Sequence, residues 1–117
     1  MLKVVALLAR KQGMSRDAFI RHYENTHAPL ARRLFPQMLD YRRNYVDLAG
    51  AIIATGASVP DFDSVTEIWF RDRSDYEAML ASHADPAIGL LIDQDEENFL
   101  DRSKTRFFVV EEHGQSG

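Results

Sequence analysis

The sequence predicts an α+β domain whose four-stranded antiparallel sheet follows the ferredoxin-like order β-α-β-β-α-β. Short apolar runs and amphipathic stretches follow one another in that order. The runs near the two ends, VVALL and FFVV, are apolar on both strand faces, whereas helices can cover only one face. A second copy of the chain is therefore expected on the other face, as a homodimer.

Length and composition fit one cytoplasmic domain. The 117 residues, 45% of them apolar, suffice for one core, with the domain at 1–112 and a disordered tail at 113–117. No cysteine is present, which excludes disulfides and thiolate sites and suits a reducing cytoplasm. The net charge of −4, with scattered basic residues, argues against nucleic acid as a partner. No signal-peptide pattern or membrane-length apolar run is seen, so no membrane association is expected.

The first half of the chain predicts a strand, a long helix and a second strand. Residues 3–9 form a short run rich in Val and Leu, typical of a buried strand. Ser15 is a good N-cap for an amphipathic helix from Arg16 to about Phe35. Alternating residues at 38–48 predict the second strand.

A loop and two further strands are expected in the second half. The stretch 49–62 is too long for a tight hairpin and too apolar for a solvated linker, which predicts an ordered loop or flap. Residues 64–71 alternate as a third strand, and 106–112 form the fourth.

Two helices are expected between the last two strands. Ser74 and Glu77 form a capping-box pattern that opens the first. Asp85 and Pro86 start the second with an N-cap and a proline at its first position. The acidic stretch 93–101 is expected to follow as a largely exposed helix or turn.

His27 is the main catalytic candidate. It lies on the apolar stripe of the first helix, two residues before Pro29, which removes a backbone donor to the Asn25 carbonyl. The helix is expected to kink or end there. An inward imidazole at a helix break suits a general acid or base. The alternative is a core histidine bonded to a freed carbonyl.

Glu67 is the second catalytic candidate, because an unpaired carboxylate would be costly in its apolar strand. If Ile68 and Phe70 pack on the helices, Glu67 faces the other way. A raised pKa there would suit proton transfer, and pairing with Arg43 or Arg71 is the structural alternative.

Several aromatic and polar residues are candidates for substrate binding. Tyr41, Arg43 and Tyr45 share one strand face and could bind a carbonyl or phenol oxygen, or could simply form cross-strand packing. Tyr23, on the helix stripe, and Trp69, on the third strand, are the other candidates for contact with the ligand.

No metal or organic cofactor is expected. The chain lacks His-x-x-x-His and Asp/Glu-rich ligand spacings, and no serine lies in a nucleophile-elbow context. Of the other histidines, His22 is expected to be exposed on the flank of the first helix. His83 and His113 are placed at a helix end and in the tail.

Three motifs resemble the EthD family of dimeric α+β barrel proteins. FIRHYENTHAPL at 19–30 is similar to the family's helix, TEIWF at 66–70 to its third strand, and FFVVEE at 107–112 to its last. The family includes accessory proteins of ether degradation, cofactor-free lactone isomerases, and dehydratases or cyclases of aromatic polyketides. The resemblance implies a dimeric α+β barrel, a small hydrophobic substrate, no cofactor, and a cavity-facing His27.

Two function classes follow. The first is a cofactor-independent isomerase, dehydratase (lyase) or cyclase acting on a small hydrophobic carbonyl, lactone or phenolic compound. The second is a non-catalytic protein that binds a hydrophobic metabolite for a partner oxygenase, and haem degradation is a third possibility. A cavity or contact shared by His27 and Glu67 would favour catalysis, and its absence would favour binding.

Overall fold

Antiparallel strand pairing organises the computed structural model, which describes residues 1–116. In chain order the elements are β1 (Leu2–Leu8), α1 (Arg16–His22), the π-helical turn η1 (Tyr23–His27), α2 (Ala28–Leu34), β2 (Met38–Tyr45), β3 (Ser64–Phe70), α3 (Arg73–Ala84), α4 (Pro86–Phe99), the 3₁₀ turn η2 (Arg102–Lys104) and β4 (Arg106–Val110). The sheet order is β2-β3-β1-β4, with every neighbouring pair antiparallel. The predicted ferredoxin-like α+β fold is confirmed.

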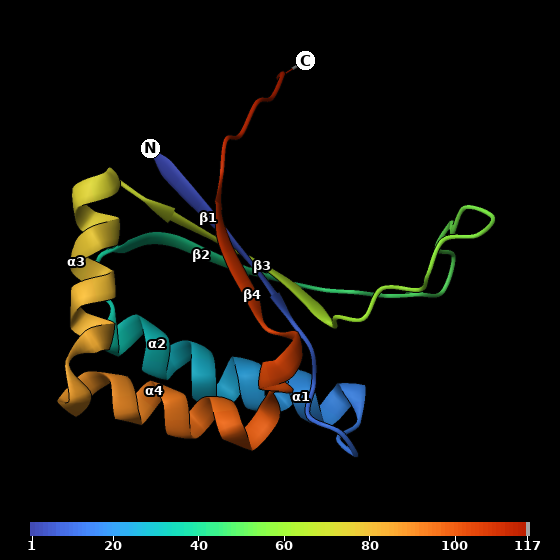
Figure 1. Ribbon diagram of the computed structural model, residues 1–117, viewed down its shortest axis with the longest axis horizontal. Coiled ribbons are helices and arrows are strands. Elements are labelled where there is room, and N and C mark those ends of the chain that lie inside the picture. Colours follow the sequence, from blue (N-terminus) through green and yellow to red (C-terminus); the bar gives the residue numbers. More distant parts are fainter. Residues whose placement is uncertain (117) are drawn as a thin grey trace.

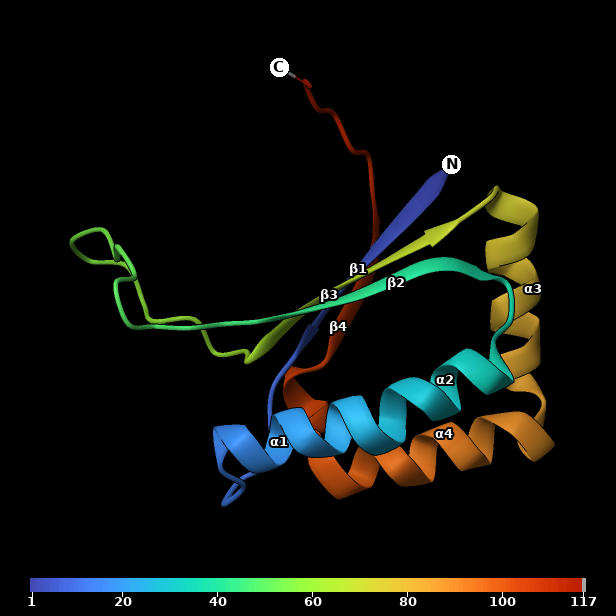
Figure 2. The same ribbon diagram turned by 180° about the vertical axis from the view of Figure 1, so that it is seen from behind.

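The helices cover one face of this sheet and leave the other open (Figures 1 and 2). Burial alternates along the strands accordingly: Val4 and Ile68 are buried on the helix side, while Val5 and Glu67 are half-buried on the other. Val5 pairs with Glu67 on one side and with Phe108 of the edge strand β4 on the other. We call this uncovered surface the open face.

The first helical region runs through the proline instead of ending at it. Ser15 caps α1 as predicted, its hydroxyl accepting from the Ala18 amide at 3.1 Å. Near His27 the helix widens into the π-helical turn η1, in which the Ala28 amide donates to the Tyr23 carbonyl. Pro29 then lies in the first turn of α2, directly after η1, and without an amide hydrogen it cannot donate to a carbonyl of that turn. The helical region therefore does not end near the proline, and a π-turn precedes Pro29.

The second helical region differs from the prediction at two points. Asp72, not Ser74, caps α3, because its carboxylate accepts from the Asp75 amide at 2.9 Å. Asp85 caps α4 as predicted. The stretch 93–101 was expected to be largely exposed, but α4 continues to Phe99 and buries Phe99 completely.

The β2–β3 connection, residues 46–63, stands away from the rest of the chain (Figures 1 and 2). We call it the arm. Beyond β4, residues 113–116 are exposed and form no helix or strand, and residue 117 of the predicted tail lies outside the described residues. Within 1–116 no helix combines the length and apolar character that crossing a bilayer requires.

Candidate functional site

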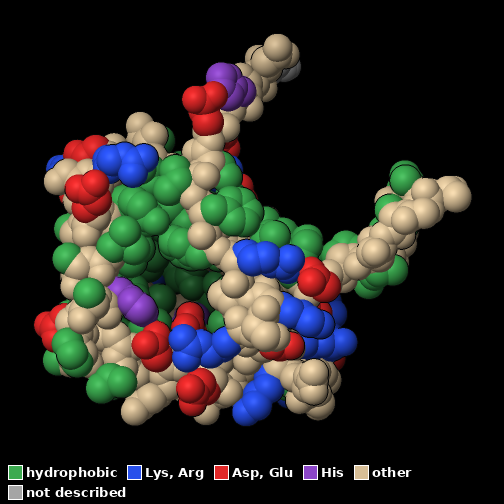
Figure 3. All heavy atoms as spheres, in the orientation of Figure 1, with side chains coloured by type: hydrophobic (Ala, Val, Ile, Leu, Met, Phe, Trp, Pro, Cys, Tyr) green, Lys and Arg blue, Asp and Glu red, His purple; other side chains and the backbone are tan. Residues whose placement is uncertain are grey.

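A cavity of about 270 Å³ lies between the helix-side face of the sheet and the helices. Figure 3 shows its mouth as a hollow with hydrophobic side chains above and inside it and a histidine and charged side chains along its left and lower edges. Its volume is near the lower end of the range for small-molecule pockets, ~300 Å³. Its apolar wall comes from strands and helices alike, including Leu8, Ala31, Phe35, Met38, Ile68, Met79, Ile92 and Phe107.

His27, the last residue of the π-helical turn η1, forms part of the wall of this cavity. It is only 5% exposed, and its ring packs against the rings of Tyr23 and Phe99, with centroid distances of 5.5 and 4.7 Å. Its Nδ1 lies 2.8 Å from Oδ2 of Asp95 on α4. The predicted inward orientation is therefore seen, with a carboxylate partner, Asp95, that was not predicted.

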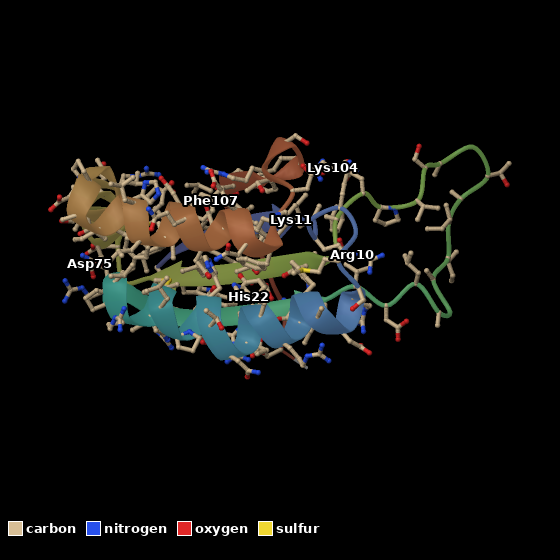
Figure 4. All side chains as sticks on the ribbon, turned by 90° about the horizontal axis from the view of Figure 1, so that it is seen from below. Arg10, Lys11, His22, Asp75, Lys104 and Phe107 are labelled. Carbon is tan, nitrogen blue, oxygen red and sulfur yellow. The ribbon has the colours of Figure 1, made fainter. Side chains whose placement is uncertain are left out.

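Asp95 joins two histidines. Its Oδ1 lies 2.8 Å from His22 Nε2, while its Oδ2 contacts His27. Figure 4 shows His22 in the seam between α1 and α4, so this residue is half-buried and not exposed as expected. Burial alone would raise the pKa of Asp95, but the hydrogen bonds from His27 and His22 outweigh it and hold that pKa below the usual range.

This carboxylate determines the tautomer of His27. Ionised Asp95 can only accept hydrogen bonds, so His27 Nδ1 must carry the hydrogen. Burial lowers the pKa of His27, against the opposing effect of Asp95, so the ring is neutral at pH 7. Nε2 is then left as an unprotonated base. His27 Nε2 forms no hydrogen bond with residues 1–116 and is not fully enclosed, and the His27 side chain lines the cavity.

Hydroxyl groups line the floor of the cavity. Tyr41 donates to the Tyr23 hydroxyl at 3.0 Å, and the Tyr23 hydroxyl lies 2.8 Å from Thr66 Oγ1. Burial raises the pKa of Tyr23 to about 12, so this phenol stays protonated at neutral pH. The Ser64 hydroxyl extends this group of hydroxyls, because its Oγ lies 3.0 Å from Thr66 Oγ1. The four hydroxyls satisfy most of one another's hydrogen-bonding capacity, which makes a polar patch tolerable in an apolar wall.

Arg43 and Tyr45 share the strand face of Tyr41, as predicted, but they do not line the cavity. The Arg43 guanidinium donates to both carboxylate oxygens of Glu24, at 2.7 and 3.0 Å, and Tyr45 donates to the same carboxylate. The hydrogen bond from Arg43 lowers the pKa of Glu24 despite partial burial. These contacts of Glu24 with Arg43 and Tyr45 join η1 to β2 beside the cavity.

Glu67 and Trp69 lie on the open face, on the other side of the sheet from His27. Glu67 was expected to pair with Arg43 or Arg71, and this prediction is wrong. Lys3 Nζ lies 2.6 Å from the Glu67 carboxylate, and the Asn44 side-chain amide donates a hydrogen bond to it at 2.9 Å. The Lys3 hydrogen bond lowers the pKa of Glu67. Within residues 1–116 the cavity lined by His27 does not include Glu67, so this pair does not share that cavity.

Glu96, one residue beyond Asp95, lines the cavity with Ile92, which lies one turn earlier on α4. Among residues 1–116 it is the one carboxylate that is not exposed and makes no side-chain hydrogen bond or ion pair. Burial raises the pKa of Glu96, in contrast to that of Asp95. His83 lies at the mouth and pairs with Asp93 at 3.1 Å.

Asp95 and Glu96 were not predicted as site residues, because the acidic stretch 93–101 resembles a solvated surface. A usable signal was present, since Ile88, Ile92, Asp95 and Phe99 recur at helical spacing and place Asp95 on an apolar stripe. An inward carboxylate on such a stripe requires a partner.

A larger, open groove of about 880 Å³ lies at the base of the arm. Charges of both signs line it, and Figure 4 shows Arg10, Lys11 and Lys104 gathered at this end of the molecule. It holds no histidine and no enclosed apolar wall, so the cavity beside His27 remains the candidate site. Within residues 1–116 no group of three or more potential ligands could hold a metal ion.

Comparison with known proteins identifies relatives of this fold. The family model of the EthD domain matches residues 11–103. The structure is similar to an ethyl tert-butyl ether D (EthD) family protein of Bacillus halodurans, with 21% identity, coverage of 97% of this chain and 100% of that one, and a TM-score of 0.63. HapK of Hahella chejuensis shares 16% identity over 100% and 97% of the two chains, with a TM-score of 0.64. An EthD-like protein of Ralstonia eutropha shares 21% sequence identity over 93% of this chain and 86% of its own chain, with a TM-score of 0.61. No curated protein matches the sequence. At these identities the solved structures show a common fold.

Proposed function

The chain belongs to the EthD domain family, and from this premise we propose that it is a cofactor-independent enzyme that moves protons on a small hydrophobic carbonyl, lactone or phenolic compound. One observation carries the proposal: Asp95 holds His27 at Nδ1, and this histidine lines a largely apolar cavity with its Nε2 free of any hydrogen bond to residues 1–116. A neutral, oriented imidazole in such a place has the properties of a general base.

The proposed reaction begins with proton removal by His27 Nε2 from a carbon next to a carbonyl group, or from a phenol. Glu96 supplies the second proton-transfer group in place of Glu67, because burial raises the pKa of its carboxyl group and so favours the protonated form, which can donate to the substrate oxygen. When His27 delivers its proton to another carbon and the enol oxygen returns its proton to Glu96, the result is isomerisation. When Glu96 instead protonates a hydroxyl group on the neighbouring carbon, the carbon–oxygen bond breaks, the group leaves as water, and exchange with solvent returns the His27 proton to Glu96; the result is elimination. Neither path requires a metal or an organic cofactor.

A second candidate function is non-catalytic binding of a hydrophobic metabolite. The mostly apolar wall and the mutually satisfied hydroxyls of Tyr23, Tyr41 and Thr66 support it, as does the separation of His27 from Glu67. Ligand identification by native mass spectrometry, followed by incubation of that ligand with wild type and His27→Gln, separates the two functions. Conversion by wild type alone supports catalysis, and binding without conversion by either supports a carrier.

We further propose that the protein acts as a homodimer in the cytoplasm, joined through the open face. Val5, Leu7, Val65 and Phe108 give that face an apolar centre that no helix covers. A two-fold axis would bury this patch against its own copy. The absence of cysteine is compatible with a reducing compartment.

A further inference from the structure

The arm, residues 46–63, exposes apolar side chains that no other part of residues 1–116 covers. Ile52 is 96% exposed, Val59 58% and Leu48 50%. The segment 48–60 contains no charged residue. A solvated loop of this length normally carries polar side chains, so this composition indicates a surface made for contact.

The base of the arm is fixed to the domain, while its outer part is not. At the base, the Val46 amide donates to the Asp63 carbonyl at 2.9 Å, and Arg106 lies 2.7 Å from Asp61. Farther out, the backbone hydrogen bonds from Ala51 to Leu48 and from Ala57 to Ala54 are turns within the arm itself. The arm therefore has a defined direction and presents its apolar tip away from the body.

The surface area of the chain also indicates a missing partner. The accessible surface is 7462 Å². A compact monomer of 13.4 kDa would expose ~6,500 Å². The excess of roughly 1,000 Å² is close to the ~800 Å² that each partner buries in a stable protein interface.

The direction of the arm identifies which partner fits. In Figures 1 and 2 its tip turns to the side of the two chain termini, away from the helices. That is the side of the open face, so a molecule that covers this face would also meet the arm. The open face carries both signs of charge, with Lys3 paired to Glu67 and Arg42 to Asp40. Such internally balanced charges suit an identical surface better than a strongly acidic or basic partner.

We propose that the arm docks on a second copy of this chain, so that each protomer holds the other through its own arm. This inference rests on the proposed homodimer and goes beyond it, because it assigns the association to residues 46–63 as well as to the open face. The contact is reciprocal, as two-fold symmetry requires.

Sedimentation equilibrium tests the proposal on wild type and on the double variant Ile52→Asp/Val59→Asp. We expect wild type at twice the chain mass and a dimer dissociation constant raised at least ~10-fold in the variant, since buried carboxylates oppose association. Leu90→Asp is the matched control, because Leu90 is an exposed leucine (56%) on α4, and it should leave the constant unchanged. A dimeric wild type whose arm variant dissociates no more readily overturns the arm proposal and leaves the homodimer standing. A monomeric wild type overturns both, and flotation of that monomer with phosphatidylcholine vesicles would assign the arm to a lipid surface.

A cross-linking experiment tests the contact directly and does not depend on a disruptive variant. Because the chain has no cysteine, Ile52→Cys can be labelled at that single site with benzophenone maleimide. Illumination should give a product of twice the chain mass, cross-linked to a residue of the second copy. A dimeric labelled protein that yields only intramolecular products would overturn the proposal.

Discussion

Asp95 Oδ2 accepts a hydrogen bond from His27 Nδ1 across 2.8 Å, joining α4 to the π-helical turn of the first helical region. The same carboxylate accepts from His22, so both oxygens are committed to imidazole donors. The contact orients His27 and leaves Nε2 as the free nitrogen. The proposed chemistry depends on this arrangement.

Replacement of Asp95 by Asn should lower turnover at least ~10²-fold, because an amide can also donate and no longer enforces the Nδ1–H tautomer. Initial rates on the identified ligand measure this effect. Asp93→Asn is the control, since Asp93 pairs with His83 at the cavity mouth and should change the rate little. Equal losses in the two variants would contradict a positioning role for Asp95.

Replacement of His27 by Gln should abolish most turnover, a loss of roughly 10²-fold or more, while the fold and oligomeric mass are retained. Gln keeps a hydrogen-bonding end but cannot exchange a proton near neutral pH. His27→Ala should in addition lose about 1–3 kcal/mol of stability, because it leaves a buried carboxylate with one partner fewer. Wild-type turnover in a stable His27→Gln protein would refute catalysis by His27.

Stability should fall with acidification in a way that depends on His27. Its folded pKa is lowered, mainly by burial, so the folded state resists protonation. The contribution of neutral His27 to the free energy of unfolding is fully present above the pKa of about 6.5 that the residue has in the unfolded chain. This contribution is lost as the pH falls from there through the lower pKa of the folded state. Urea unfolding between pH 5 and pH 8 should show this slope in wild type and a weaker one in His27→Gln. Identical slopes would show that His27 does not titrate as described.

Filling the cavity should block ligand binding. Ala31 lines the cavity from α2 and is buried, so Ala31→Phe places a ring inside it, at a cost of about 1–3 kcal/mol in stability. Fluorescence titration with 2-naphthol, a small neutral phenol, should give a dissociation constant at least ~10-fold higher than wild type. Ala81→Phe on the exposed side of α3 should bind normally. Undiminished binding by Ala31→Phe would place the ligand elsewhere.

The fold was predictable because the local sequence patterns, apolar alternation in the strands and capping residues at helix starts, correspond to the strands and helices that form. Alternation of Val4, Ala6 and Leu8 with half-buried neighbours produces one covered face, and the Asp85-Pro86 start of α4 depends on two adjacent residues. The π-turn was not predictable in the same way. Whether a helix ends near Pro29 or widens before it depends on packing against other elements.

The site was only half predictable, because its central contact is distant in sequence. His27 stood out from the apolar stripe of its own helix. Asp95 lies 68 residues beyond His27 and 73 beyond His22, within an acidic stretch whose composition suggests a solvated surface. Glu67 was placed on the correct face, but that face lies opposite the cavity.

The tautomer of His27 is the most direct test, since it needs no substrate. Long-range ¹H–¹⁵N correlation spectra of ¹⁵N-labelled protein at pH 7.5, with His27→Gln for assignment, distinguish the two ring nitrogens. Hydrogen on Nδ1 with a bare Nε2 is the result that the contact with Asp95 predicts. A ring with hydrogen on Nε2, or a fully protonated ring at that pH, would contradict the assignment of His27 as a base facing the cavity.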